Sequence, residues 1–186
     1  MPKTPVPIPS SSRRAFLIAG AAVAVSGCGG AGPADRQLMF ASLADAMREL
    51  DRLKEAAPLD AGANWTWSKT LLHCAQSIDY SMSGYPEPKS AVFQYTAGAG
   101  AFSFFRRRGR MSHNLIEAIP GAAMLDANAH VPVAVAALRK SVAAFLAYDG
   151  KLKPHFAYGA LDRADYERAH AMHIANHLSV FDAKKS

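Results

Sequence analysis

The sequence predicts an all-α protein whose helices pack as an antiparallel bundle. Apolar residues recur at the 3.6-residue spacing of an α-helix in five segments, and turn residues such as Pro58 and Gly84 separate them. No stretch alternates between apolar and polar residues as a half-buried strand does, and there is no internal repeat. The connections between the segments are long, which argues against a simple meander joined by short loops.

The first two predicted helices cover residues 35–56 and 70–82. In the first, apolar residues such as Leu50 are separated by charged ones, which is the amphipathic pattern of a helix with one buried face. The second carries His73 within an apolar stretch, and Gly84 follows its end. We therefore expect one face of each helix to lie in the core.

Three further helices are predicted over residues 90–108, 129–148 and 162–181. Alanines and phenylalanines give the first of them a broad apolar face. Pro132 fits the first turn of the second helix. Asp162 is a suitable N-cap for the third, with another aspartate three residues later.

The N-terminus carries the features of an export signal over residues 1–27. Its apolar core of about 13 residues is shorter than the roughly 18 to 20 that a membrane span needs. Arg13 and Arg14 stand in Ser-Arg-Arg-x-Phe-Leu, which resembles a twin-arginine signal, and Val-Ser-Gly-Cys28 resembles a lipobox. An ordinary cleaved signal with an incidental cysteine is the alternative.

These resemblances imply an exported protein of the periplasm or cell envelope, held at the membrane by a lipid on Cys28 and loaded with its cofactor in the cytoplasm. Residues 28–34 are then a tether, and residues 35–183 form one helical domain with a sizeable core. Only Cys74 remains as a free thiol, so no intramolecular disulfide forms. Its apolar neighbours predict a small buried residue without chemistry of its own.

The charge balance gives no indication of nucleic-acid binding. The net charge of +6 falls to +3 once Lys3, Arg13 and Arg14 leave with the signal. The one dense basic cluster is Arg106 to Arg108 with Arg110. A solvated helix end is the favoured interpretation of this cluster, and a site for phosphate or lipid headgroups is the alternative.

Histidines near the C-terminus indicate a metal site. On an α-helix, His170, His173 and His177 fall within a wedge of roughly 60°, so their side chains share one face. His73 is the expected further ligand, because an unpaired imidazole is costly to bury in an apolar helix. Taken alone, His73 is more readily interpreted as a hydrogen-bonded structural residue. Three nitrogens with one open position are typical of catalytic Zn²⁺ and similar ions.

The residues around these histidines exclude two better-known metal motifs. A zinc-protease helix needs a glutamate directly after its first histidine, where this chain has Ile174. Glu167 and His170 match one Glu-x-x-His motif of a di-iron bundle, but the chain has no second copy.

Several short motifs, in order, carry a resemblance to a known family. They are Trp67-Ser68, Leu72-His73-Cys74-Ala75-Gln76-Ser77, Ser83-Gly84-Tyr85-Pro86, Met111-Ser112-His113, Ile119-Pro120-Gly121-Ala122, His155-Phe156-Ala157-Tyr158-Gly159 and His173-x-x-x-His177-Leu178. Together they resemble the DinB/YfiT-like superfamily, and within it domain-of-unknown-function family 1569. The resemblance covers roughly residues 35 to 183.

That resemblance implies an antiparallel bundle of four main helices with an additional helical segment and long connections. It also implies a divalent metal ion, zinc or nickel, held by His73, His173 and His177. Relatives include thiol-dependent transferases and metal-dependent hydrolases, and some form dimers, so a homodimer is a further expectation that no pattern in this chain shows. The chain departs from the usual ending at Ser179-Val180-Phe181, where related chains often carry further histidine, arginine or glutamine residues.

Four further residues are candidates for roles around the metal. His170 is expected to support the ligands without binding the ion, because not all three histidines of one helix reach the same ion alongside His73. An alternative ligand and a proton shuttle are its other possible roles. His113, Glu117 and His155 fall in connecting loops, where functional residues often lie. Each is a candidate general acid or base, and a plain surface residue is the alternative for the two histidines.

Three functions fit these features. The first is a metal-dependent hydrolase or thiol-dependent transferase acting on a small molecule that the sequence does not identify. The second is an envelope lipoprotein that binds a metal or a small ligand without turnover. The third is a structural bundle in which the histidines satisfy one another. Metal content separates the third from the other two.

Overall fold

The computed structural model of the chain describes Met1 and residues 35–53, 56–58 and 65–183. The predicted signal with Arg13 and Arg14, Cys28 and the tether lie outside these residues. The elements are α1 (Leu43–Arg52), β1 (Ala56–Pro58), α2 (Trp67–Ser83), α3 (Ala91–Phe93), the π-helix η1 (Gln94–Gly98), α4 (Ala99–Arg108), α5 (Val131–Ala147), α6 (Arg163–Leu178) and β2 (Phe181–Ala183). The domain is mostly helical, which confirms the all-α prediction.

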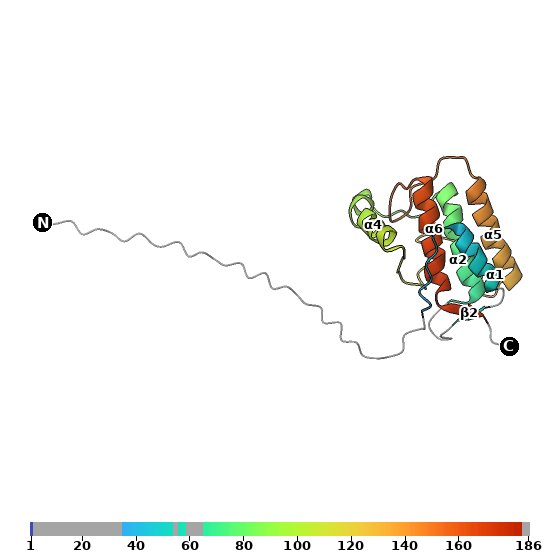
Figure 1. Cartoon of the computed structure of the whole chain (residues 1–186). Helices are drawn as coiled ribbons and strands as arrows, with labels where there is room; N and C mark the ends of the chain where they lie inside the picture. Colours follow the sequence, from blue (N-terminus) through green and yellow to red (C-terminus); the bar gives the residue numbers. More distant parts are fainter. Residues whose placement is uncertain (2–34, 54–55, 59–64, 184–186) are drawn as a thin grey trace. The chain divides into compact units, whose positions relative to one another are not determined.

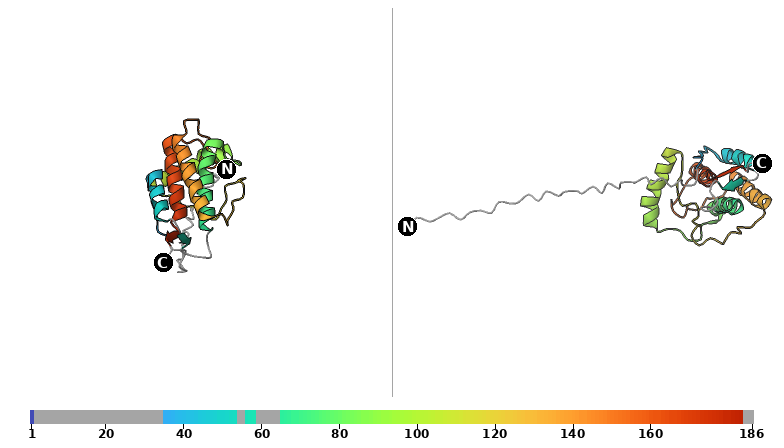
Figure 2. Two further views of the ribbon diagram at one scale, coloured as in Figure 1. Left: turned by 90° about the vertical axis from the view of Figure 1, so that its right-hand side faces the viewer. Right: turned by 90° about the horizontal axis from the view of Figure 1, so that it is seen from below.

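Helices α1, α2, α5 and α6 lie side by side, and their ends show their directions (Figure 1, Figure 2). α1 and α6 both end at the small sheet, because β1 and β2 follow them and pair antiparallel. α2 begins there, since the ring of Trp67 lies 5.0 Å from that of Phe181 in β2. α5 ends at the opposite end, where Arg163 at the start of α6 donates to the carbonyl of Phe145 at 2.9 Å.

The helix directions correct part of the expected antiparallel arrangement. α5 and α6 are antiparallel, but α2 and α5 run in the same direction, opposite to α1 and α6. The segment between α2 and α5 makes this possible, because it returns the chain to the sheet end before α5 starts. The long connection was visible in the sequence, whereas its path depends on tertiary contacts.

The segment from α3 to α4 is one helical run with a π-helical turn in the middle, and it lies outside the four packed helices (Figure 2). The predicted broad apolar face is not a core face. Phe102 is buried against α6, while Phe104 is 59% exposed and Phe93 is 40% exposed. Gly98 allows close packing here, because an added Cβ would lie 1.9 Å from the carbonyl oxygen of Ala157.

Two predicted boundaries change for local reasons. α1 starts at Leu43 rather than at residue 35, because Ser42 and Asp45 form a capping box. The residues before it run along the end of α6, where the backbone N–H of Arg36 donates to the carbonyl of Ser179 at 2.9 Å. α6 ends at Leu178, and the chain continues into β2. These strands have three residues each, too few to show an alternating pattern.

The space between the four helices is filled mainly by apolar side chains. Fully buried examples are Leu50, Leu71, Ile78, Leu138, Phe145 and Ile174. His73, His170 and His177 are also buried, so imidazoles replace apolar side chains on the facing sides of α2 and α6. Within the described part of the chain, no helix has the length and apolar character needed to cross a membrane.

Candidate metal centre

Three histidines from two helices converge between α2 and α6. His73 of α2 and His173 and His177 of α6 each offer one ligand atom, and these atoms lie within 4.8 Å of one another. Their ring centroids are 4.7 to 5.1 Å apart. This is the trio that the sequence predicted as metal ligands, and such a group could hold a metal ion.

The local sequence explains why these side chains face one another. Positions 173 and 177 are four residues apart, so one face of α6 presents both imidazoles. α6 begins at its N-cap Asp162, whose side chain accepts from the backbone N–H of Asp165. α2 begins at Thr66, whose hydroxyl accepts a hydrogen bond in the same way. The packing of α2 against α6 then adds His73 to the pair.

The three imidazoles of the cluster are held in the neutral form. Burial, followed by the nearby charges of His113 and Lys69, lowers the pKa of His73 to about 4. Burial followed by the neighbouring imidazoles places the pKa of His173 and of His177 well below the usual value. All three rings are therefore neutral at pH 7, which is the protonation state that binds a metal.

An unpaired nitrogen in this cluster also fits a metal ion. The Nδ1 atom of His73 is buried and has no hydrogen-bond partner in the described part of the chain. A buried polar atom without a partner is costly, and coordination of a cation by this nitrogen would remove that cost. The donor set of imidazole nitrogens suits zinc, nickel and similar ions.

A fourth imidazole approaches from the connection between α4 and α5. Nε2 of His113 lies 3.2 Å from Nε2 of His177, and Nδ2 of Asn176 lies 3.0 Å from Nδ1 of His113. The sequence placed His113 in a loop as a candidate acid or base, and the structure brings it against the predicted ligands. Asn176 was not predicted, because a residue directly before His177 points about 100° away from it on an α-helix.

Trp65, just before α2, packs against the same cluster. Its ring lies 5.1 Å from the ring of His73 and is stacked 6.4 Å from that of His177. The ammonium of Lys69 lies 4.3 Å from the centre of the indole. No helical periodicity covers Trp65, so sequence analysis did not identify it. Its indole is well placed to report on binding at the histidines.

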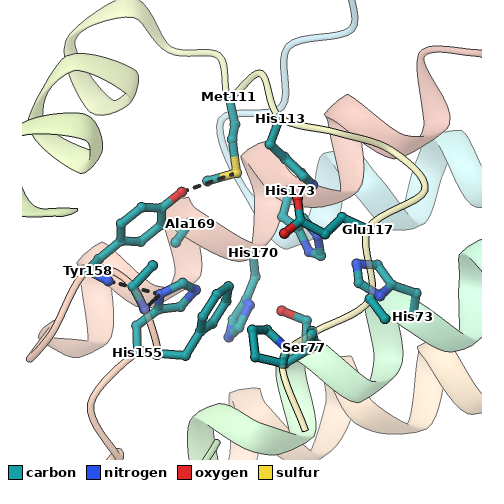
Figure 3. Close-up of a pocket in the computed structure, with 15 residues that line it drawn as sticks. His73, Ser77, Met111, His113, Glu117, His155, Tyr158, Ala169, His170 and His173 are labelled. Atoms are coloured by element: carbon teal, nitrogen blue, oxygen red, sulfur yellow. Dashed lines mark hydrogen bonds between the residues drawn. The ribbon is translucent and has the colours of Figure 1, made fainter. Parts of the chain in front are cut away.

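A cavity of about 220 Å³ opens beside the cluster (Figure 3). Its lining combines imidazoles with small apolar side chains and includes His73, Ser77, Met111, His113, Glu117, Ile119, Pro120, His155, Phe156, Tyr158, Ala169, His170 and His173. Glu117 is the one carboxylate among the residues that line it, and none of them is a lysine or arginine. All four predicted residues outside the trio lie around this cavity.

His155 lines the cavity from the connection between α5 and α6. Its Nδ1 accepts from the backbone N–H groups of Ala157 and Tyr158 at 3.1 and 3.2 Å, so the neutral ring carries its proton on Nε2. Burial lowers its pKa to about 3. Two backbone hydrogen bonds, one in each direction between His155 and Gly159, fix the turn that holds the ring, and Gly159 has a φ of +75°.

His170 lies deeper, on α6. Its ring meets that of Phe145 edge-on at 5.1 Å and stacks on that of Tyr166 at 5.3 Å. Nε2 has no hydrogen-bond partner among the described residues, and burial lowers the pKa to about 3. His170 is therefore a neutral, aromatically packed residue that also reaches the cavity lining.

Cys74 and the arginines at the end of α4 match their sequence predictions. Cys74 is a fully buried free thiol, and burial raises its pKa above the usual value. In the basic cluster, Arg106, Arg107 and Arg108 form the exposed end of α4, where Arg106 pairs with Asp165 at 3.1 Å. These three residues agree with a solvated helix end, whereas Arg110 is largely buried and pairs with Asp35.

Comparison with known proteins identifies a family. The family model described as "Protein of unknown function (DUF1569)" matches residues 33–184, which include every described element of the domain. No curated protein and no solved structure matches the chain.

Proposed function

The chain belongs to the DUF1569 family of proteins of unknown function, and we propose that it is a metal-dependent hydrolase or thiol-dependent transferase. The observation that carries this proposal is the convergence of three neutral imidazoles beside a cavity that a small molecule can enter. The packing of α1, α2, α5 and α6 supports a bundle of the DinB/YfiT type. We take zinc or nickel as the ion.

The chemistry follows from the donor set and the cavity. A divalent ion held by His73, His173 and His177 supplies a Lewis acid that polarises a substrate and acidifies water or a thiol. Glu117 is the residue we assign as proton acceptor, because its carboxylate is the one acidic group in the lining. His155 has its Nδ1 engaged, so it acts as an Nε2–H donor that orients the substrate.

The cavity indicates the class of substrate. A cavity of roughly 150 Å³ holds benzene, so 220 Å³ is suited to about one ring with a small substituent. The lining offers mainly apolar side chains and neutral imidazoles, and no basic side chain is among its residues. We therefore propose a small, largely apolar substrate whose polar group lies toward the ion.

Metal binding is tested by thermal unfolding and by the fluorescence of Trp65. Zinc at about 100 times its dissociation constant adds about 2.7 kcal/mol, which raises Tm by roughly 5 to 11 °C. Nickel at the histidines quenches Trp65, while Trp67 packs against Phe181 and responds less. Metal content is expected to be one ion per chain in protein purified without chelators or a histidine tag.

Two variants distinguish loss of the metal site from a general effect of replacing a histidine. His177→Ala is expected to bind the ion much more weakly and to reduce both responses. His130→Ala is the matched control, because this exposed histidine caps α5 away from the cluster. A wild-type protein that takes up neither zinc nor nickel contradicts the proposal.

Turnover is tested on the metal-loaded protein with uncharged esters, amides and thiol-conjugation substrates. Glu117→Gln is expected to reduce turnover while metal content stays at one ion per chain. Metal binding without any turnover across the screen favours the alternative of an envelope lipoprotein that binds a metal or small ligand.

We further propose that the protein is exported and lipid-anchored through Cys28. The support is the sequence of residues 1–28, with its paired arginines and Val-Ser-Gly-Cys ending. Mass spectrometry of the mature N-terminus tests this: an acylated Cys28 as first residue is expected, and an unmodified N-terminus elsewhere contradicts it.

A further inference from the structure

His113 reaches the candidate metal centre from a loop, whereas the three proposed ligands come from helices. It lies in the exposed connection after α4, between the buried side chains of Met111 and Ile119. Its ring centroid is 5.1 Å from that of His173 and 5.0 Å from that of His177. In Figure 3 its side chain points from the loop toward His173 and the cavity.

The distance between His113 and His177 matches that between two ligands of one ion. Zinc lies about 2.0 to 2.1 Å from histidine nitrogens, so two ligands of a tetrahedral ion are about 3.3 Å apart. The two Nε2 atoms are 3.2 Å apart. Two neutral imidazoles in this geometry share either a proton or a cation, because two facing lone pairs repel.

Asn176 gives His113 the support that a metal ligand needs. A ligating histidine usually donates its other N–H to a nearby acceptor, which fixes the ring and raises its basicity. The Asn176 amide lies 3.0 Å from Nδ1 of His113 and is 7% exposed. With its nitrogen toward the ring, Asn176 leaves the proton of His113 on Nε2. With its oxygen toward the ring, it accepts from Nδ1–H and frees the Nε2 lone pair for an ion.

We propose that His113 is a fourth, displaceable ligand of the ion held by His73, His173 and His177, and that Asn176 positions it. This inference rests on the proposed metal site, and it adds a way in which access of the substrate to the ion is regulated. His113 fills the open position at rest, and the substrate takes that position when His113 moves away. No helix has to unpack for this step, because the exposed residues between Met111 and Ile119 carry His113.

Zinc affinity of the full-length protein, measured by competition with a chelator, is the first test. Asn176→Leu is expected to weaken zinc binding roughly 10- to 100-fold, and His113→Ala at least as much. Asn176→Asp is expected to strengthen it, because a carboxylate only accepts and so holds the proton on Nδ1 of His113. His130→Ala is the control and keeps the wild-type affinity.

The visible spectrum of the cobalt-substituted protein is the second test, and it does not depend on activity. The wild type is expected to show a four-coordinate cobalt spectrum that His113→Ala loses and that added free imidazole restores. A merely structural role for His113 predicts no such rescue. Unfolding in the presence of a chelator checks that each variant folds.

The outcomes separate this inference from the proposed function. Unchanged zinc affinity together with an unchanged cobalt spectrum in His113→Ala overturns the fourth-ligand proposal and leaves the three-histidine site standing. Equal weakening by Asn176→Asp and Asn176→Leu overturns the positioning role of Asn176. A wild-type protein that binds no metal, or an unchanged zinc affinity in His177→Ala, refutes the proposed site itself.

Discussion

Replacing His170 with phenylalanine is expected to make the metal-free protein markedly more resistant to acid. His170 is 2% exposed, and its ring packs against Phe145 and Tyr166. Phenylalanine keeps these ring contacts and removes the titrating nitrogen. The variant therefore isolates the effect of protonating one buried imidazole.

The sign follows from the lowered pKa of His170, which burial brings to about 3. The unfolded chain has the usual histidine value of about 6.5, so below that pH the unfolded state binds a proton that the folded state excludes. Stability contributed by the neutral ring is complete above about pH 6.5 and is lost as the pH falls toward 3. One pKa unit corresponds to about 1.36 kcal/mol, which gives a loss of about 2 kcal/mol between pH 7 and pH 5.

Urea unfolding at pH 5, 6, 7 and 8 with a chelator present measures this difference. Other buried histidines such as His155 destabilise both proteins in acid by the same amount, so their contributions cancel when the two free energies of unfolding are compared. The wild type should lose about 2 kcal/mol more than His170→Phe between pH 7 and pH 5. His130→Ala, at an exposed position, should follow the wild type. Equal pH dependence in the wild type and His170→Phe would refute the reasoning.

Further predictions concern packing away from the histidines. Gly98→Ala is expected to destabilise the fold by about 1 to 3 kcal/mol, because the new Cβ meets the carbonyl oxygen of Ala157. Gly100→Ala, with open space around its Cβ, should instead stabilise α4 by roughly 0.5 to 1 kcal/mol in urea unfolding, and the same sign for both variants would contradict the assigned contact. Cys74→Ser should cost about 1 to 3 kcal/mol because its hydroxyl is buried without a prepared partner, and a thiol reagent should label Cys74 only in urea.

The predicted ligand set shows which parts of the site local sequence patterns can predict. The facing of His173 and His177 is a property of one helix, because backbone hydrogen bonds within α6 fix the angle between positions four residues apart. An apolar stretch around His73 indicated a buried helix face. The meeting of that face with α6 was inferred from the family resemblance and from the cost of burying an unpaired imidazole.

The sequence by itself determined the helical class, the five helical segments and the pair of imidazoles on α6, because these follow from a backbone period that each segment carries alone. Only the tertiary structure decided the parallel run of α2 and α5, the β1–β2 pairing, and the approach of Trp65, His113 and Asn176 to the cluster. Loop placement and short strands depend on contacts between residues far apart in the chain. Such contacts produce no periodic pattern in the sequence, so the sequence alone does not predict them.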